Sequence, residues 1–188
     1  MITSIFDTDI VKVLSLFALS PGSKFRRQEI QLKTKINNVP LDKALSKLVS
    51  SNVFKKEKLL YSIEINDYSK GIISLLSKQY KELKELPLDV YFTLIEISSV
   101  VSTAKDVELY LFGSYSKLIY TENSDIDLAV ITNNKSFKKE NLTRLITKLE
   151  GVYGKTIETH YFEKTSFYKN KSDPLVKDIL RNGVKLVG

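Results

Sequence analysis

The chain has 188 residues, of which 43% are hydrophobic and 27% are charged, and it contains no cysteine. This composition is typical of a globular protein with one large domain or two small ones, and it excludes disulfides and thiolate metal sites. The formal net charge is +7, and residues 1–86 hold most of the excess, with 15 Lys and Arg against 9 Asp and Glu. Such a basic half favours a polyanionic partner, with a merely solvated surface as the alternative.

The start of the chain does not resemble a membrane anchor or a signal peptide. Its longest apolar run, VLSLFALS, is far shorter than a membrane span and follows Asp7, Asp9 and Lys12. We therefore expect a cytoplasmic protein that does not act in a membrane.

The first part of the chain has the spacing of three helices followed by two strands. Helical spacing of apolar residues covers residues 7–19, 25–36 and 41–51, with breaks at SPGS and NNVP. The period then changes, and VFKK and LLYSIEI read as strands joined by a tight turn at Glu57 and Lys58.

Three helices and a basic hairpin resemble a winged helix-turn-helix domain, which we assign to residues 1–66. In such a domain the third helix enters the major groove and the hairpin touches the DNA backbone. The residues expected to contact nucleic acid are Lys43, Lys47, Lys55, Lys56 and Lys58. Docking against a protein is the alternative role.

Residues 67–86 return to helical spacing and predict a connecting helix that ends before Pro87. Its apolar stripe predicts either a homodimer seam or packing within the chain. Residues 87–188 then alternate helices with the strands VELYLF, DIDLAVIT and KTIETHYF, which predicts a second domain built as a mixed sheet with helices.

Two carboxylates, Asp125 and Asp127, stand one residue apart at the head of an apolar strand. Side chains alternate across a strand, so both face the same way and repel each other unless a cation lies between them. Oxygen ligands on a strand suit Mg²⁺. The pair Gly113 and Ser114 upstream offers backbone N–H groups and a hydroxyl for a phosphate, so the whole stretch predicts a metal–triphosphate site.

The Gly-Ser pair, ten intervening residues and NSDIDL are similar to the signature of the DNA polymerase β-type nucleotidyltransferase superfamily, and the short domain resembles its minimal branch. The resemblance implies an α+β domain that uses two Mg²⁺ ions and a nucleoside triphosphate, expected to be ATP. It also implies that Asp125 and Asp127 bind metal, with Glu158 as the third carboxylate, and that Gly113, Ser114 and Lys117 hold the phosphates. The family more usually has Asp at the position of Glu158 and Arg-x-x-Gly where this chain has Lys117, Leu118 and Ile119.

The resemblance implies transfer of a nucleoside monophosphate to an acceptor hydroxyl on a nucleic acid or on a protein such as a partner toxin. A DNA-binding transcription regulator that binds nucleotide without turnover is the alternative. A small-molecule modifier of the aminoglycoside-nucleotidylating kind is the least expected, because no substrate-binding domain follows residue 188. His160, on the same face as Glu158, is expected to be a merely exposed or hydrogen-bonded residue, with assistance to the site as the alternative.

Overall fold

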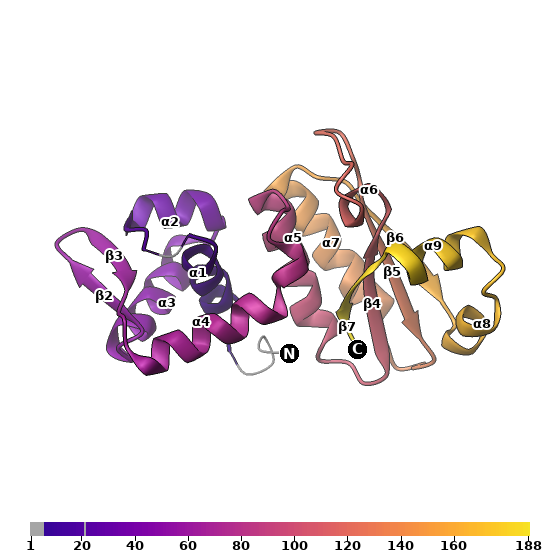
Figure 1. The fold of residues 1–188 in the computed structure, drawn as a ribbon, viewed down its shortest axis with the longest axis horizontal. Coiled ribbons are helices and arrows are strands. Elements are labelled where there is room, and N and C mark those ends of the chain that lie inside the picture. Colours follow the sequence, from indigo (N-terminus) through magenta and orange to yellow (C-terminus); the bar gives the residue numbers. More distant parts are fainter. Residues whose placement is uncertain (1–5, 21) are drawn as a thin grey trace. The chain divides into compact units, whose positions relative to one another are not determined.

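The computed structural model describes residues 6–20 and 22–188, and the chain divides into two compact units, Met1–Lys84 and Glu85–Gly188 (Figure 1). The division falls close to Pro87, in the short segment that precedes the first helix of the second unit. Within the described residues, no helix combines the length and the apolar composition that crossing a bilayer requires.

The described part of the first unit combines helices with a three-stranded antiparallel sheet in the order β1-β3-β2. Its elements are α1 (Thr8–Leu19), β1 (Phe25–Arg26), α2 (Arg27–Thr34), α3 (Asn38–Ser50), β2 (Phe54–Glu57), β3 (Leu60–Ile63), α4 (Asp67–Gln79) and a 3₁₀ helix (Lys81–Leu83).

Local signals explain where these elements begin, and an aromatic cluster holds them together. The Asp7 carboxylate caps α1 by accepting from the Asp9 N–H, and Asn66 caps α4 by accepting from Ser69. In the core, the Phe17 ring of α1 meets the rings of Phe25 and Phe54 at centroid distances of 5.1 and 4.5 Å. The helix and the sheet are therefore joined through one buried side chain.

Three local expectations for this unit were wrong. Phe25 does not begin a helix but pairs with Tyr61 in the sheet. Glu57 pairs with Leu60, so the hairpin turn lies one residue later than predicted, at Lys58 and Leu59. The helix predicted over residues 67–86 ends at Gln79, and it lies wholly within the first unit, which extends to Lys84.

The second unit is built on a four-stranded mixed sheet in the order β6-β5-β4-β7, in which β4 is antiparallel to β5 and β7 while β5 is parallel to β6. Its elements are α5 (Leu88–Val101), β4 (Val107–Phe112), α6 (Gly113–Ser116), β5 (Ile126–Thr132), α7 (Lys139–Tyr153), β6 (Ile157–Phe162), α8 (Lys164–Lys169), α9 (Pro174–Asn182) and β7 (Val184–Val187).

Helices cover both faces of this sheet, α5 and α7 on one and α8 and α9 on the other (Figure 1). The Tyr153 hydroxyl of α7 donates to Glu96 of α5 at 2.9 Å. On the opposite face, Ala129 and Ile131 of β5 pack with Phe167 of α8 and Ile179 of α9. Since Asp127 alternates in step with Ala129 and Ile131, it lies on the face covered by α8 and α9.

The predicted α+β class with a mixed sheet is confirmed for this unit. Two elements were not predicted. Helix α8 was missed, and the final VKLVG, expected only as a short ending, forms strand β7 beside β4.

Candidate functional site

Three strands bring the predicted site residues to one edge of the sheet. Strand β4 ends at Phe112, where the antiparallel β5 begins, and the parallel β6 begins at the same edge. Phe112 pairs with Asp127, and Asp127 pairs with Glu158, so these side chains form one row across the sheet. The fold thus places the end of one strand and the starts of two others at a single point.

Gly113 lies directly against the Asp127 carboxylate. Its φ is +73°, in the left-handed region that favours glycine, and a Cβ added there would lie 2.0 Å from Asp127 Oδ2. No side chain fits in that space without displacing the carboxylate. The glycine predicted to hold a phosphate therefore also leaves room for the metal-binding aspartate that we predicted.

The carboxylates of the site repel one another. Burial raises the pKa of the half-buried Asp127, and the negative charges of Glu158 and Asp125 raise it further, while His160 and Lys117 act in the opposite direction. Asp125 is exposed and precedes β5, which begins at Ile126, so only one of the two aspartates lies within the strand.

Glu158 and His160 lie on the same face of β6 and form a side-chain pair. His160 Nε2 is 3.3 Å from Glu158 Oε1, and the imidazole meets the Phe112 ring edge to face at a centroid distance of 5.4 Å. His160, for which assistance to the site was the alternative expectation, therefore lies beside Glu158 and contributes to the electrostatic environment of the Asp127 carboxyl.

Lys117 follows α6 and pairs with a carboxylate that sequence reasoning did not identify. Its Nζ lies 2.8 Å from both oxygens of Asp178 on α9, and Asp178 Oδ1 also accepts from the Asn182 amide at 2.7 Å. The Lys117 hydrogen bond lowers the pKa of Asp178. No sequence signal near Asp178 indicates this role, because α9 reaches the site only through the fold of the sheet.

The residue after Lys117 keeps a backbone conformation that favours glycine. Leu118 has φ +57°, and its side chain is half exposed to solvent. The chain therefore turns sharply just after α6, in a conformation that few residues other than glycine adopt readily.

The row of acidic residues fits a divalent cation with oxygen ligands. Among residues 6–20 and 22–188, no three His, Asp or Glu side chains already stand close enough together to hold a metal ion. Mg²⁺ usually takes only one or two protein carboxylates and completes its shell with water and substrate phosphates. Asp125 and Asp127 would supply two such carboxylates, and Glu158 lies next to Asp127 in the sheet register.

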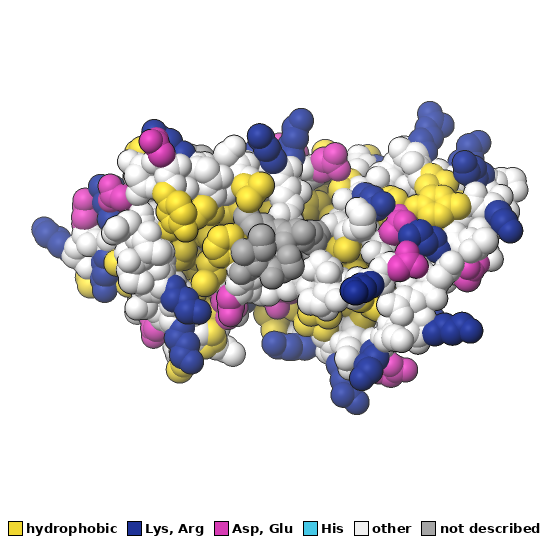
Figure 2. Space-filling model, turned by 90° about the horizontal axis from the view of Figure 1, so that it is seen from below, with side chains coloured by type: hydrophobic (Ala, Val, Ile, Leu, Met, Phe, Trp, Pro, Cys, Tyr) yellow, Lys and Arg dark blue, Asp and Glu magenta, His cyan; other side chains and the backbone are white. Residues whose placement is uncertain are grey.

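The five lysines predicted to contact nucleic acid lie in the first unit but not on one surface. Lys43 and Lys47 are exposed one turn apart on α3, and Lys58 is exposed in the hairpin turn. Lys55 and Lys56 are opposite Ser62 and Tyr61 respectively, so they point to opposite faces of the hairpin. Figure 2 shows basic side chains spread over the face drawn, some beside acidic ones and others beside one another.

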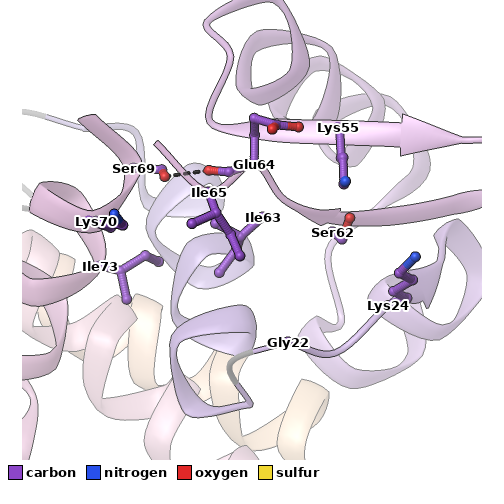
Figure 3. Close-up of a pocket in the computed structure, with 10 residues that line it drawn as sticks. All are labelled: Gly22, Lys24, Lys55, Ser62, Ile63, Glu64, Ile65, Ser69, Lys70 and Ile73. Atoms are coloured by element: carbon purple, nitrogen blue, oxygen red, sulfur yellow. Dashed lines mark hydrogen bonds between the residues drawn. The ribbon is translucent and has the colours of Figure 1, made fainter. Parts of the chain in front are cut away.

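The residues around the hairpin also show that Lys55 and Lys56 lie on opposite faces of it. Lys56 lines a shallow hollow with Asp42 and Ser46 of α3. Lys55 instead lines a cavity of about 370 Å³ whose floor includes Ile63, Ile65 and Ile73 (Figure 3). Beside it, the Ser69 hydroxyl donates to the Glu64 carbonyl, which fixes the start of α4. Of the two hairpin lysines, only Lys56 lies on the side of α3.

Two comparisons with known proteins bear on this arrangement. No curated protein matches the chain in a sequence search. Residues 94–186, which include β4, β5, β6 and every predicted site residue of the second unit, match the sequence model of the family described as "Nucleotidyltransferase domain".

Proposed function

We propose that the second unit transfers a nucleoside monophosphate, AMP being the expected one, from a nucleoside triphosphate to a hydroxyl group on a protein or a nucleic acid. The observation that carries the proposal is the row Phe112–Asp127–Glu158 with Gly113 against Asp127, inside the region that matches the nucleotidyltransferase family. The short second unit and its motif support the polymerase β-type superfamily as the wider group.

The residues of the chain divide the chemistry among them. Backbone N–H groups following Gly113 and the Ser114 hydroxyl bind phosphate oxygens, and Lys117 supplies a positive charge beside them. Asp125 and Asp127 would hold Mg²⁺, which supplies charge neutralisation for the triphosphate and lowers the pKa of the acceptor hydroxyl. Glu158 accepts the proton of that hydroxyl as its oxygen bonds to the α-phosphorus, and the bond to the β-phosphate breaks to release pyrophosphate.

The substitution Glu158→Gln tests this assignment. We expect the variant to bind a nonhydrolysable triphosphate with Mn²⁺ as the parent does, because Asp125 and Asp127 remain, and to lose transfer by about 100-fold or more. Transfer is measured with each labelled nucleoside triphosphate, Mg²⁺ and cell extract, by label on macromolecules and by pyrophosphate release. Glu158→Asp, the superfamily's usual residue with a shorter side chain, should keep partial activity.

Two results would contradict the proposal in different ways. Transfer by Glu158→Gln at the parent rate would move the proton acceptor elsewhere, with His160 and Glu163 as the next candidates. Triphosphate binding without transfer by the parent protein in any extract would favour the regulator that binds nucleotide without turnover.

We also propose that the first unit is a winged helix-turn-helix domain that contacts duplex DNA. The succession of α1, α2 and α3, followed by the antiparallel hairpin β2–β3, supports this assignment. Lys43 and Lys47 on the exposed side of α3, with Lys56 on the hairpin face beside it, would meet the phosphates.

A further inference from the structure

A second cavity, of about 690 Å³, opens in the second unit beside the chain segments that carry Ser114 and Asp125. It lies between the start of α5, helix α6, the loop from Tyr120 to Asn123 and Lys155 before β6. This volume is within the range of pockets that hold small molecules such as nucleotides. The resemblance to known enzymes assigned no residue of this cavity a role.

The cavity and the acidic row share the same short segments of chain. Tyr115, which lines the cavity, directly follows Ser114 on α6, and Asn123 precedes Asp125 by two residues. The loop between them is held at both ends, because Ile119 N–H donates to the Ser114 carbonyl and Ile126 N–H donates to the Thr156 carbonyl. The cavity wall is therefore continuous along the chain with Ser114 on one side and, two residues beyond Asn123, with Asp125 on the other.

One wall of the cavity is aromatic. The rings of Tyr115 and Tyr120 stack at a centroid distance of 4.6 Å and an angle of 21°. Tyr115 is only 1% exposed, whereas Tyr120 is half-buried and its hydroxyl donates to the Glu85 carbonyl at 3.3 Å. A ring fixed on one side by stacking and by a hydrogen bond is preorganised to stack a planar ligand on the other side.

The charges around the cavity disfavour phosphate and favour an uncharged polar group. Asp89 and Glu122 each contribute a carboxylate to the lining. The Lys155 ammonium group, the one positive side chain among the described residues of the lining, donates a hydrogen bond to the backbone carbonyl of Glu122 at 2.7 Å. Carboxylates repel phosphate groups but accept hydrogen bonds from amino and hydroxyl groups. The buried Tyr115 hydroxyl, which has no hydrogen-bond partner in the described part of the chain, adds another polar atom to this wall.

We propose that this cavity holds the base and ribose of the nucleoside triphosphate, with the base stacked on Tyr120, while the phosphates lie at Gly113 and the acidic row. This inference rests on the proposed function, since it assumes that a nucleotide binds at Asp125 and Asp127. It identifies Tyr120 as the residue that distinguishes a nucleoside triphosphate from a bare polyphosphate.

Calorimetry on the full chain with Mn²⁺ and two probes, a nonhydrolysable ATP analogue and inorganic tripolyphosphate, tests the inference. The parent protein should bind the ATP analogue more tightly than tripolyphosphate. Tyr120→Ala should weaken the ATP analogue about tenfold or more, because a base loses its stacking partner, and should leave tripolyphosphate within about twofold. Tyr120→Phe, the matched control, keeps the ring and its stacking on Tyr115 but loses the hydrogen bond to Glu85, so it should bind the ATP analogue much more tightly than Tyr120→Ala does and tripolyphosphate as the parent does.

Tyr120→Leu fills the loop with an apolar side chain and guards against a folding defect in the alanine variant; the same selective loss is expected. Equal weakening of both probes, or of neither, would overturn the inference. So would equal affinity of the parent for the two probes, which would leave the proposed function standing. Failure of the parent to bind either probe would instead overturn the proposed function, and the inference with it.

Discussion

At the scale of single residues, the geometry of the site depends on how closely Gly113 approaches Asp127. We predict that Gly113→Ala lowers the free energy of unfolding of the second unit by about 2 kcal/mol, because a left-handed backbone and a contact of 2.0 Å both oppose the new methyl group. The variant should also bind Mn²⁺–triphosphate more weakly.

The control for this substitution is Gly151→Ala. Gly151 lies inside α7 with nothing near its added Cβ, so alanine there should stabilise the helix by about 0.5–1 kcal/mol. Chemical unfolding of both variants measures the difference. A Gly113→Ala variant as stable as the parent would show that the Asp127 carboxylate moves away at little cost.

The charged form of the Asp127 carboxyl lowers the stability of the folded protein. Burial raises the pKa of its carboxyl, so the folded state disfavours the charged form and loses stability as the pH rises through the window from 3.8 to the raised value. We predict that Asp127→Asn unfolds at a higher temperature than the parent at neutral pH. This advantage should vanish at about pH 3, where the parent carboxyl is protonated in both states.

Thermal scans at both pH values, with and without Mn²⁺ and triphosphate, check this prediction. The ligand should stabilise the parent by about 2.7 kcal/mol at 100 times its dissociation constant and should leave the asparagine variant unchanged. A variant less stable than the parent at neutral pH without ligand would contradict the argument, because it would mean that the carboxylate stabilises the free protein.

At the scale of elements, a polar cluster fastens β7 and α8 to β4 at the other end of the sheet face. Glu108 on β4 is only 8% exposed, accepts from the Tyr168 hydroxyl at 2.6 Å and pairs with Lys185 of β7 and Lys164 of α8 at 3.0 and 3.1 Å. Burial alone would raise the pKa of Glu108, but these partners outweigh it and lower the pKa to about 2.

We predict that Glu108→Gln lowers the free energy of unfolding by about 2 kcal/mol at neutral pH, since two lysines lose a buried partner. Because folding lowers the pKa of Glu108, this stabilisation is present above the ordinary pKa of a glutamate, 4.5, and is lost as the pH falls toward about 2. Urea unfolding of the parent and the variant should therefore converge in acid. Glu140→Gln, an exposed residue of α7, should show no such effect, and parallel curves for Glu108→Gln and the parent would contradict the prediction.

The same elements show what the sequence could and could not predict. Strand β4 and helix α7 were predicted with their bounds, because a run of apolar residues interrupted only by Glu108 and a regular apolar stripe are strong local patterns. Strand β7 and helix α8 were missed, since each is short and is held mainly by long-range contacts such as those of Glu108.

The candidate site follows the same rule. Gly113 and Asp127 were proposed from a local motif, and Glu158 because the resemblance implies a third carboxylate on a neighbouring strand; the structure places Glu158 opposite Asp127 in the sheet. Asp178 and Tyr120 were not found, because they meet their partners only through α9 and through the stacking of one loop on α6. Contacts between distant segments have no signature in a single sequence.

At the scale of the whole molecule, the excess positive charge lies mainly in the first half of the chain, and the hairpin register divides its lysines between two faces. Phosphate contacts release counterions, so binding to duplex DNA should weaken steeply with salt. We predict that four contacts, from Lys43, Lys47, Lys56 and Lys58, give a slope of about −3.6 in a plot of log affinity against log salt concentration.

Substitutions on the two faces separate this prediction from simple charge attraction. Lys43→Gln combined with Lys47→Gln should reduce the slope by about 1.8, because two phosphate contacts are lost from α3. Lys55→Gln removes the same kind of charge from the hairpin, but the Lys55 side chain points to the face of the isoleucine-lined cavity, so the slope should stay near that of the parent.

Fluorescence anisotropy with a labelled duplex at several salt concentrations measures all three proteins. If Lys55→Gln lowers the slope as much per lysine as the α3 variant does, the duplex contacts both faces of the hairpin, and the predicted DNA-binding surface is wrong. If the parent shows no binding at low salt, the first unit docks on a protein instead, and its lysines only keep that surface hydrated.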